Sequence, residues 1–221
     1  MNMSDRVDLR VNVRIGIFRH NKLVDVRETH NVMTAEGRAW ALRALAASAF
    51  PDNAAPTPLV TSKLKYIGFG CGGALQTDTR FLRTQQELAS VVALEDPVPL
   101  AIDSGTLVHT YLKPIQPIAE NAIFFPTSTQ MLCICNTLES EIAFVGDSDD
   151  KTAKTFASSV LVGSEVPVSE AGLYLSTAAA THDNGLGNPV AANGLVCYNI
   201  FDPIIVTPNT SLRMEWCLRL L

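Results

Sequence analysis

The sequence has few charged and few aromatic side chains. Charged residues make up 18% of its 221 positions and aromatic residues 7%, whereas apolar residues make up 47%. The formal net charge is -5, so the chain lacks the surplus of Lys and Arg that binds phosphate backbones. This composition excludes a disordered chain, argues against nucleic acid as a partner and predicts a full hydrophobic core.

A long apolar run is also missing. No segment reaches the roughly 18 uninterrupted apolar residues of a membrane-spanning helix, and the polar segment Met1–Arg14 does not resemble a secretion signal. The cysteines are odd in number and scattered, unlike the framework of a disulfide-rich secreted domain. We therefore expect a soluble protein made in the cytoplasm, with no membrane contact and with buried free thiols. The cysteines are Cys71, Cys133, Cys135, Cys197 and Cys217.

Motifs that carry chemistry are scarce as well. Gly68, Gly70 and Gly73 fit the spacing of a dinucleotide-binding loop, but the polar segment that follows has no helical pattern to hold a pyrophosphate. Cys133 and Cys135 share one face of an expected strand, yet no second Cys or His pair completes a tetrahedral metal site. We expect neither a nucleotide cofactor nor a thiolate-bound metal.

The other candidates for a metal site or a catalytic centre are no stronger. Asp147, Asp149 and Asp150 resemble part of a calcium loop, but Lys151 occupies a ligand position and the turn glycine is absent. The four histidines have no ligand spacing, and no nucleophile elbow, phosphate loop or zinc-protease motif occurs. The sequence thus predicts no catalytic residue, no cofactor and no metal, which favours a protein that is not an enzyme.

Alternation of apolar and polar residues indicates strands along most of the chain. Asp8–Phe18 and Leu23–Thr29 are joined by a short polar turn, so residues 1–30 are expected to form a hairpin. Leu212–Leu220 shows the clearest alternation. The pattern predicts an all-β fold, an antiparallel β-sandwich with long loops, as one domain over residues 1–221. The other expected strands are Leu64–Gly70, Gly105–Leu112, Met131–Cys135, Glu141–Val145, Phe156–Val162, Val168–Leu175 and one that begins at Leu195.

One helix is expected near the start of the chain, over residues 34–49, with Thr34 as its N-cap. Its apolar residues fall on two faces, and we assign the larger face to the core. Trp40 lies on the opposite face with Ala44 and Ala47, so these three are interface candidates of a homo-oligomer, with a loop of the same chain as the alternative cover. The core face is assigned to Ala35, Ala39, Leu42, Leu45, Ala46 and Ala49.

Four sequence blocks occur in an order that resembles tail-fibre, tail-collar and baseplate-type proteins of tailed bacteriophages. The first leads into the helix, the second is a strand with a Gly-x-Gly end, the third contains Glu-Ala-Gly-Leu, and the fourth is the closing strand. The loops Pro51–Ser62 and Thr177–Asn193 depart from the compact pattern of that family, so the position in a particle is not predicted. The blocks are Thr29–Arg38, Leu64–Gly70, Val168–Tyr174 and Leu212–Leu221.

The resemblance implies a non-enzymatic structural protein of the virion, assembled in the host cytoplasm. Such a protein acts as a homo-oligomer or multi-copy ring and contacts neighbouring tail, collar or baseplate proteins. The alternative is a carbohydrate-binding β-sandwich of a receptor-binding fibre, for which Phe50, Phe124 and Phe125 are the available aromatic residues.

The residues of these blocks also have a structural interpretation. Glycines such as Gly68, Gly70 and Gly73 permit a positive φ and a close approach of the backbone at a turn. Glu170, two positions before Gly172, is expected to satisfy backbone donors inside a packed strand.

Overall fold

The computed structural model describes most of the strands and the helix that the sequence predicts. Several predicted features lie outside the described residues: Gly73, the acidic turn Asp147–Asp150, the strand Phe156–Val162, and the loops Pro51–Ser62 and Thr177–Asn193. The structure describes residues 9–49, 63–72, 88–95, 97–98, 100–103, 107–110, 112–115, 122–127, 129–139, 141–142, 165–176 and 194–220.

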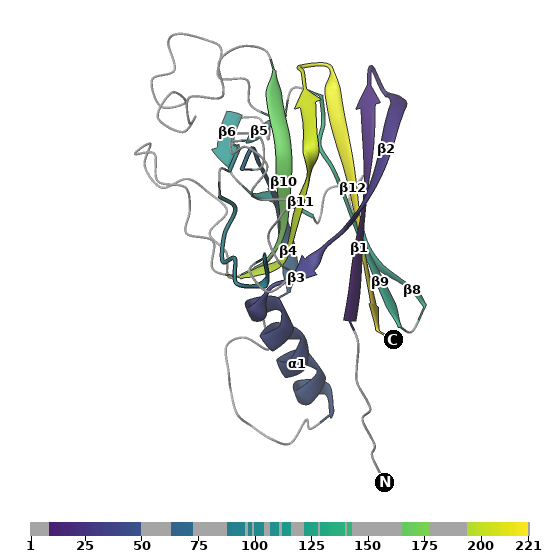
Figure 1. Cartoon of the computed structure of the whole chain (residues 1–221), viewed down its shortest axis with the longest axis vertical. Helices are drawn as coiled ribbons and strands as arrows, with labels where there is room; N and C mark the ends of the chain where they lie inside the picture. The colour runs from purple at the N-terminus through teal and green to yellow at the C-terminus, as the bar shows by residue number, and fades with distance from the viewer. Residues whose placement is uncertain are drawn as a thin grey trace.

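Two five-stranded antiparallel sheets face each other and form the body of the molecule (Figure 1). The strand order is β2-β1-β12-β9-β8 in the first sheet and β3-β11-β10-β4-β7 in the second, and β5 pairs with β6 in a separate small sheet. The predicted all-β sandwich with one helix is thus confirmed. The elements are β1 (Leu9–Arg19), β2 (Lys22–His30), β3 (Val32–Met33), α1 (Ala35–Ala49), β4 (Leu64–Gly70), β5 (Leu100–Asp103), β6 (Leu107–Thr110), β7 (Lys113–Pro114), β8 (Ala122–Thr127), β9 (Gln130–Asn136), β10 (Val166–Leu175), β11 (Leu195–Val206) and β12 (Thr210–Leu220).

β1 and β12 lie side by side near the centre of the first sheet. Both strands alternate apolar and polar residues, so each has one apolar face. They pair along their full lengths, from Leu9 opposite Leu220 to Arg19 opposite Thr210. Their alternate apolar side chains are buried against the second sheet, as the alternation predicted. The buried residues are Val11, Val13, Ile15 and Ile17 of β1 and Leu212, Met214, Trp216 and Leu218 of β12.

The predicted N-terminal hairpin is present in the described residues. β1 and β2 are joined by His20 and Asn21, whose φ angles are 48° and 59°. Two consecutive left-handed residues are typical of a two-residue hairpin turn, which matches the twist of the strands on either side.

The second sheet is covered on its outer face as well as its inner one. Residues 88–95, which we call the strap, lie over this outer face. Leu94 of the strap belongs to a small apolar cluster with Tyr66, Tyr174 and Tyr198 of the sheet. All residues of β10 except Pro167 are therefore buried, on both faces of the strand.

Side-chain contacts tie the two sheets together along β2 and β11. Arg27 Nη1 donates a hydrogen bond to the carbonyl oxygen of Asp202 at 2.8 Å. Asn199 Nδ2 donates to Thr29 Oγ1 at 2.6 Å. β2 of the first sheet is thereby held against β11 of the second.

Helix α1 is in the predicted place but faces a different way. Thr34 Oγ1 accepts a hydrogen bond from the backbone N–H of Gly37 at 3.0 Å, which confirms Thr34 as the N-cap. A Cβ at Gly37 would lie 2.2 Å from the carbonyl oxygen of Val196, so only glycine allows this approach to β11. Trp40, three positions later on the same helix face, packs against the main core. The assignment of Leu42 to the core is wrong, since Leu42 is 67% exposed.

The strands that sequence analysis missed are short. β3 and β7 have two residues each, β5 has four and β8 has six. The predicted strand Glu141–Val145 is described only at its first two residues, of which Ile142 forms an isolated bridge with Leu100. In the described part of the chain, no helix is long and apolar enough to cross a membrane.

Candidate functional site

Residues of the first three sequence blocks meet on the second sheet. β4 and β10 are hydrogen-bonded neighbours, with Gly68 opposite Gly172 and Gly70 opposite Glu170. Gly68 and Gly70 therefore lie inside a strand. The positive φ expected at these two glycines is wrong, because Gly194 is the glycine that has one among the described residues (φ 95°).

Glu170 is the central polar group of this region, and its side chain is fully buried. The backbone N–H of Gly72 donates to Oε1 at 3.1 Å, and the backbone N–H of Glu95 donates to Oε2 at 3.2 Å. The hydroxyl of Tyr198 donates to Oε2 at 2.7 Å. These contacts confirm that Glu170 satisfies backbone donors inside a packed strand, and they make it an anchor for the strap.

Gly172 gives the strap room to lie on the sheet. A Cβ at this position would lie 2.7 Å from Leu195 Cδ1 and 3.3 Å from Leu94 Cδ2. The hydroxyl oxygen of Tyr174 accepts a hydrogen bond from the backbone N–H of Leu94 at 3.2 Å. Burial raises the pKa of Tyr174 above its usual range, so the phenol stays neutral. The space that a Cβ would take at Gly172 is thus filled by neighbouring side chains.

The start of α1 is fixed to β11 by polar residues of the first block. The backbone N–H of Thr34 donates to the carbonyl oxygen of Val196 at 3.0 Å, and its hydroxyl donates to the carbonyl oxygen of Leu195. Glu36 Oε2 accepts a hydrogen bond from the backbone N–H of Gly194 at 2.9 Å. These groups hold the helix at its first turn.

The cysteines are free thiols, and four of the five are buried. Burial raises the pKa of Cys133 to about 12 and that of Cys135 and Cys197 above the usual range. These three thiols remain protonated at neutral pH and are poor nucleophiles. The prediction of buried free thiols is confirmed except at Cys217, which is partly exposed. Among the described residues, no group of three or more His, Cys, Asp or Glu is placed to hold a metal ion.

Comparisons with known proteins give no family for this chain. No protein-family model matches it, and neither the curated proteins nor the solved structures include a match. Function is therefore inferred from the geometry of the described residues and from the order of the sequence blocks.

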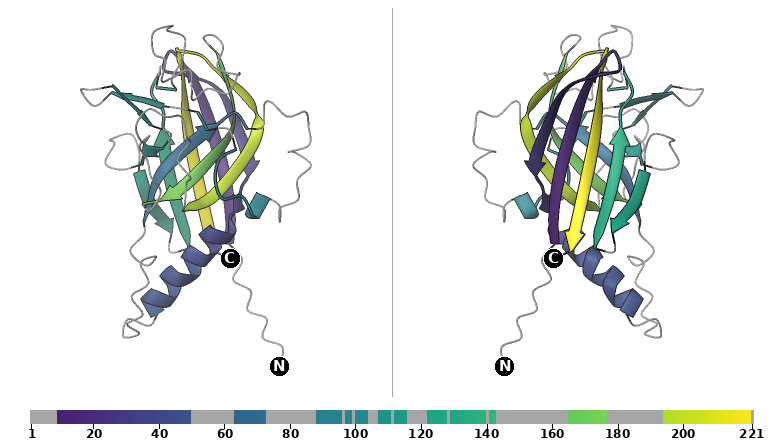
Figure 2. Two further views of the ribbon diagram at one scale, coloured as in Figure 1. Left: turned by 90° about the vertical axis from the view of Figure 1, so that its left-hand side faces the viewer. Right: turned by 90° about the vertical axis from the view of Figure 1, so that its right-hand side faces the viewer.

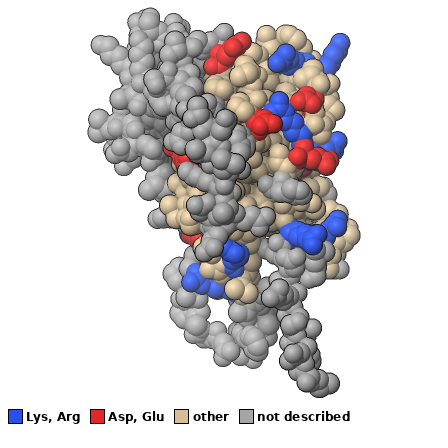
Figure 3. Space-filling model, viewed as in Figure 1, with Lys and Arg blue, Asp and Glu red and all other residues tan. Residues whose placement is uncertain are grey.

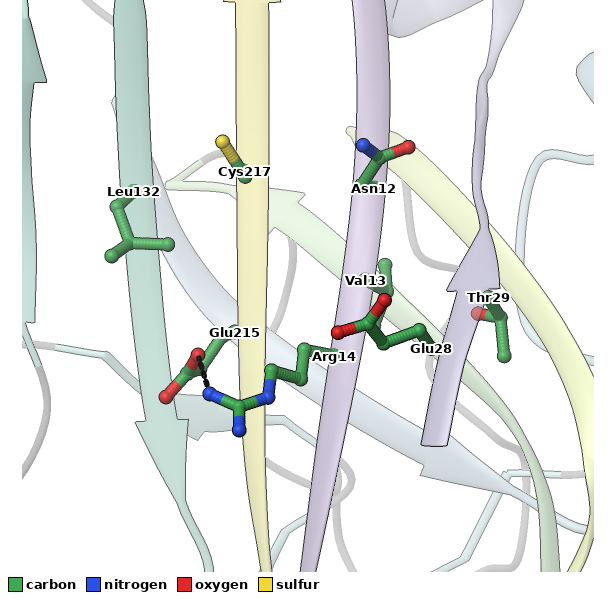
Figure 4. A pocket seen from close by; sticks show the side chains of 8 residues that line it. All are labelled: Asn12, Val13, Arg14, Glu28, Thr29, Leu132, Glu215 and Cys217. Atoms are coloured by element: carbon green, nitrogen blue, oxygen red, sulfur yellow. Dashed lines mark ion pairs between the residues drawn. The ribbon is translucent and has the colours of Figure 1, made fainter. Parts of the chain in front are cut away.

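A shallow hollow of about 500 Å³ lies on the outer face of the first sheet (Figure 4). Strand register places Arg14 between Glu28 on β2 and Glu215 on β12. Arg14 Nη1 is 3.7 Å from Glu215 Oε2, and Arg213 Nε is 2.7 Å from Glu215 Oε1. Two arginines thus share one carboxylate. The hollow is lined by Asn12, Val13, Arg14, Glu28, Thr29, Leu132, Glu215 and Cys217.

The surface around this hollow mixes both signs of charge. The hollow itself has one arginine and two glutamates, together with Leu132 on β9 and Cys217 on β12. In the view of Figure 3, basic and acidic side chains are likewise interleaved. Such a surface offers hydrogen bonds and ion pairs to another polar surface. The hollow was not predicted from the sequence, because its residues come from four strands that become neighbours only in the sheet.

A buried ion pair was also missed. Lys113 Nζ on β7 is 2.6 Å from Glu141 Oε2, and the two side chains are 2% and 5% exposed. The backbone N–H of Leu138 donates to the same carboxylate oxygen at 2.6 Å. The pair ties β7, at the edge of the second sheet, to the segment that follows β9 in the first.

The three predicted interface residues do not form one exposed face. Trp40 packs against the main core, Ala44 is exposed, and the side chain of Ala47 lies outside the described residues. Among the helix side chains that the structure describes, the large apolar one that is exposed is Leu42, which had been assigned to the core. Phe125 on β8 is 72% exposed.

Proposed function

We propose that this protein is a non-enzymatic structural component of a tailed-phage particle, in the tail, collar, baseplate or fibre attachment. It acts by assembling with copies of itself and with neighbouring virion proteins. The proposal rests on the resemblance of the four sequence blocks and on helix α1.

Helix α1 is the observation that supports self-assembly. It extends beyond the end of the sandwich in both views of Figure 2, and its first turn makes the polar contacts with β11. Its polar residues are Glu36, Arg38, Arg43 and Ser48, so apolar residues surround most of the helix. A helix that is apolar on all sides is normally buried, and Leu42 and Ala44 are exposed. A neighbouring subunit that covers them supplies the missing partner.

The polar residues of the sequence blocks support a structural role as well. Thr34 caps the helix, Glu36 holds Gly194, and Glu170 anchors the strap. Each of these side chains is used to join segments of the fold. The resemblance to tail proteins therefore lies in residues that build the scaffold.

Sedimentation of purified protein tests the assembly. Leu42→Glu is expected to weaken self-association, since burying a leucine is worth about 1.5–3 kcal/mol and a buried glutamate adds a further penalty. Leu138→Glu is the matched control, because Leu138 is also exposed (58%) but follows β9. A wild-type protein that stays monomeric at micromolar concentration, alone and with purified tail proteins, contradicts the proposal. The density for this chain in particle images tests the location directly.

A carbohydrate-binding module of a receptor-binding fibre is the second candidate function. The observation that favours it is the exposure of Phe125, since an exposed aromatic ring stacks on the apolar face of a sugar. The side chains of Phe50 and Phe124, the other two candidates, lie outside the described residues. Binding on a glycan array that is lost in Phe125→Ala supports this function, and an array without binding opposes it.

A further inference from the structure

Strand β2 forms one edge of the first sheet over nine residues. The free N–H and C=O groups of an edge strand are a template for pairing with a further strand. β2 also carries exposed apolar side chains, since Leu23 and Val24 are each 54% exposed and Val26 is 37% exposed. This edge therefore has both the backbone groups and the apolar surface that strand pairing uses.

Asp25 and Arg27, which we call the edge clasp, occupy this edge. The backbone N–H of Val26 donates to Asp25 Oδ1 at 2.8 Å, so this N–H does not serve the ladder to β1. Arg27 Nε donates to Asp25 Oδ2 at 3.3 Å, and Arg27 Nη1 donates to the carbonyl oxygen of Asp202 at 2.8 Å. The clasp covers the middle of the edge and holds it against β11.

We propose that the edge clasp holds back pairing between the β2 strands of two copies of this chain, and that β2 is the docking surface for the second copy when the clasp opens. Antiparallel pairing of identical strands is self-complementary, as a two-fold contact requires. When Val26 lies opposite Val26 of the other copy, Asp25 of each copy lies opposite Arg27 of the other. The charges that close the edge within one chain then pair between chains.

The other described edges are poorer sites for a second copy. β3 and β7 have two residues each, which is too short for a stable ladder. β8 contains Pro126, which has no N–H to donate, and a register irregularity between Phe124 and Thr127. Among the described edge strands, β2 is the long one without a proline.

The test compares wild-type protein with Asp25→Ala by sedimentation velocity over ~1–100 μM. Asp25→Ala frees the N–H of Val26 and is expected to tighten self-association at least about 10-fold, the change that ~1.4 kcal/mol produces. Adding Val26→Pro removes that N–H and is expected to restore wild-type behaviour. Proline is tolerated where the N–H faces away from the neighbouring strand. The matched control is Glu28→Ala, which removes a carboxylate of β2 outside the clasp.

Two results overturn the proposal: an Asp25→Ala protein that sediments like wild type at every concentration, or an association that survives Val26→Pro. If circular dichroism shows that Asp25→Ala does not fold, Asp25→Val is used in its place, because valine favours strands and also frees the N–H of Val26; the same results would support or overturn the proposal. A labelled peptide of residues 22–30 is expected to bind the opened variant and not wild type. In a Leu42→Glu background the effect is expected to persist, which separates this contact from assembly through α1.

Discussion

Replacing Glu170 tests whether this carboxylate anchors the strap. Glu170→Ala removes the carboxylate that accepts hydrogen bonds from two backbone N–H groups and from the hydroxyl of Tyr198 in a buried site. Each buried donor that loses this acceptor lowers the free energy of unfolding by about 1–3 kcal/mol. Removal of the buried carboxylate offsets part of this loss, because its desolvation penalty disappears. We expect a loss of about 3–5 kcal/mol in the free energy of unfolding. In a chain of this size that lowers Tm by roughly 10 °C.

Urea denaturation followed by circular dichroism measures this loss. Tyr198→Phe is the matched control, because it removes one donor and leaves the carboxylate with its two backbone partners. Tyr198→Phe is expected to lower the free energy of unfolding by about 1–2 kcal/mol. The variant that carries both substitutions gives the coupling energy between the two side chains. The reasoning is refuted if Glu170→Ala costs less than about 1 kcal/mol, or no more than Tyr198→Phe.

Four further predictions concern other parts of the fold. Gly37→Ala should destabilise by several kcal/mol in thermal unfolding, because its Cβ would overlap a carbonyl oxygen of β11. Lys113→Met or Glu141→Leu alone should cost about 3–5 kcal/mol. The double variant should cost only about 1–3 kcal/mol, because the backbone N–H of Leu138 still loses its acceptor; equal costs for all three would contradict a buried pair. Of the five thiols, Cys217 should react first with a thiol reagent in native buffer. Stability should fall as pH rises from 9 towards 12, because Cys133 ionises only in the unfolded chain there.

Sequence periodicity predicted the strands whose two faces differ in polarity. The alternation in β1 and β12 gave their extent and their buried residues, because one face of each strand meets the core. The same reasoning failed for α1. Apolar residues surround most of this helix, so their periodicity does not show which face is buried. Gly37 was the available signal, since a glycine inside a helix marks a close contact with another element.

The interactions that were missed join residues far apart in the chain. Lys113 and Glu141 become neighbours only when β7 of the second sheet meets the segment that follows β9 of the first, and the sequence around either residue does not predict the other. The hollow on the first sheet likewise depends on the order of β2, β1, β12 and β9. That Glu170 needs hydrogen-bond donors was predictable, because it is a glutamate within an apolar strand. That the donors come from Gly72, from Glu95 of the strap and from Tyr198 was not.

The pairing of β1 with β12 has a consequence for how the chain folds. Its partners, from Leu9 with Leu220 to Arg19 with Thr210, are separated by about 200 positions. The loop that closes between them must lose its entropy before the ladder forms, and contacts at such separation slow folding. During synthesis, the β1–β2 hairpin emerges long before β12 and exposes the face that carries Ile15. Until β12 arrives, that face is a site for chaperone binding or for aggregation.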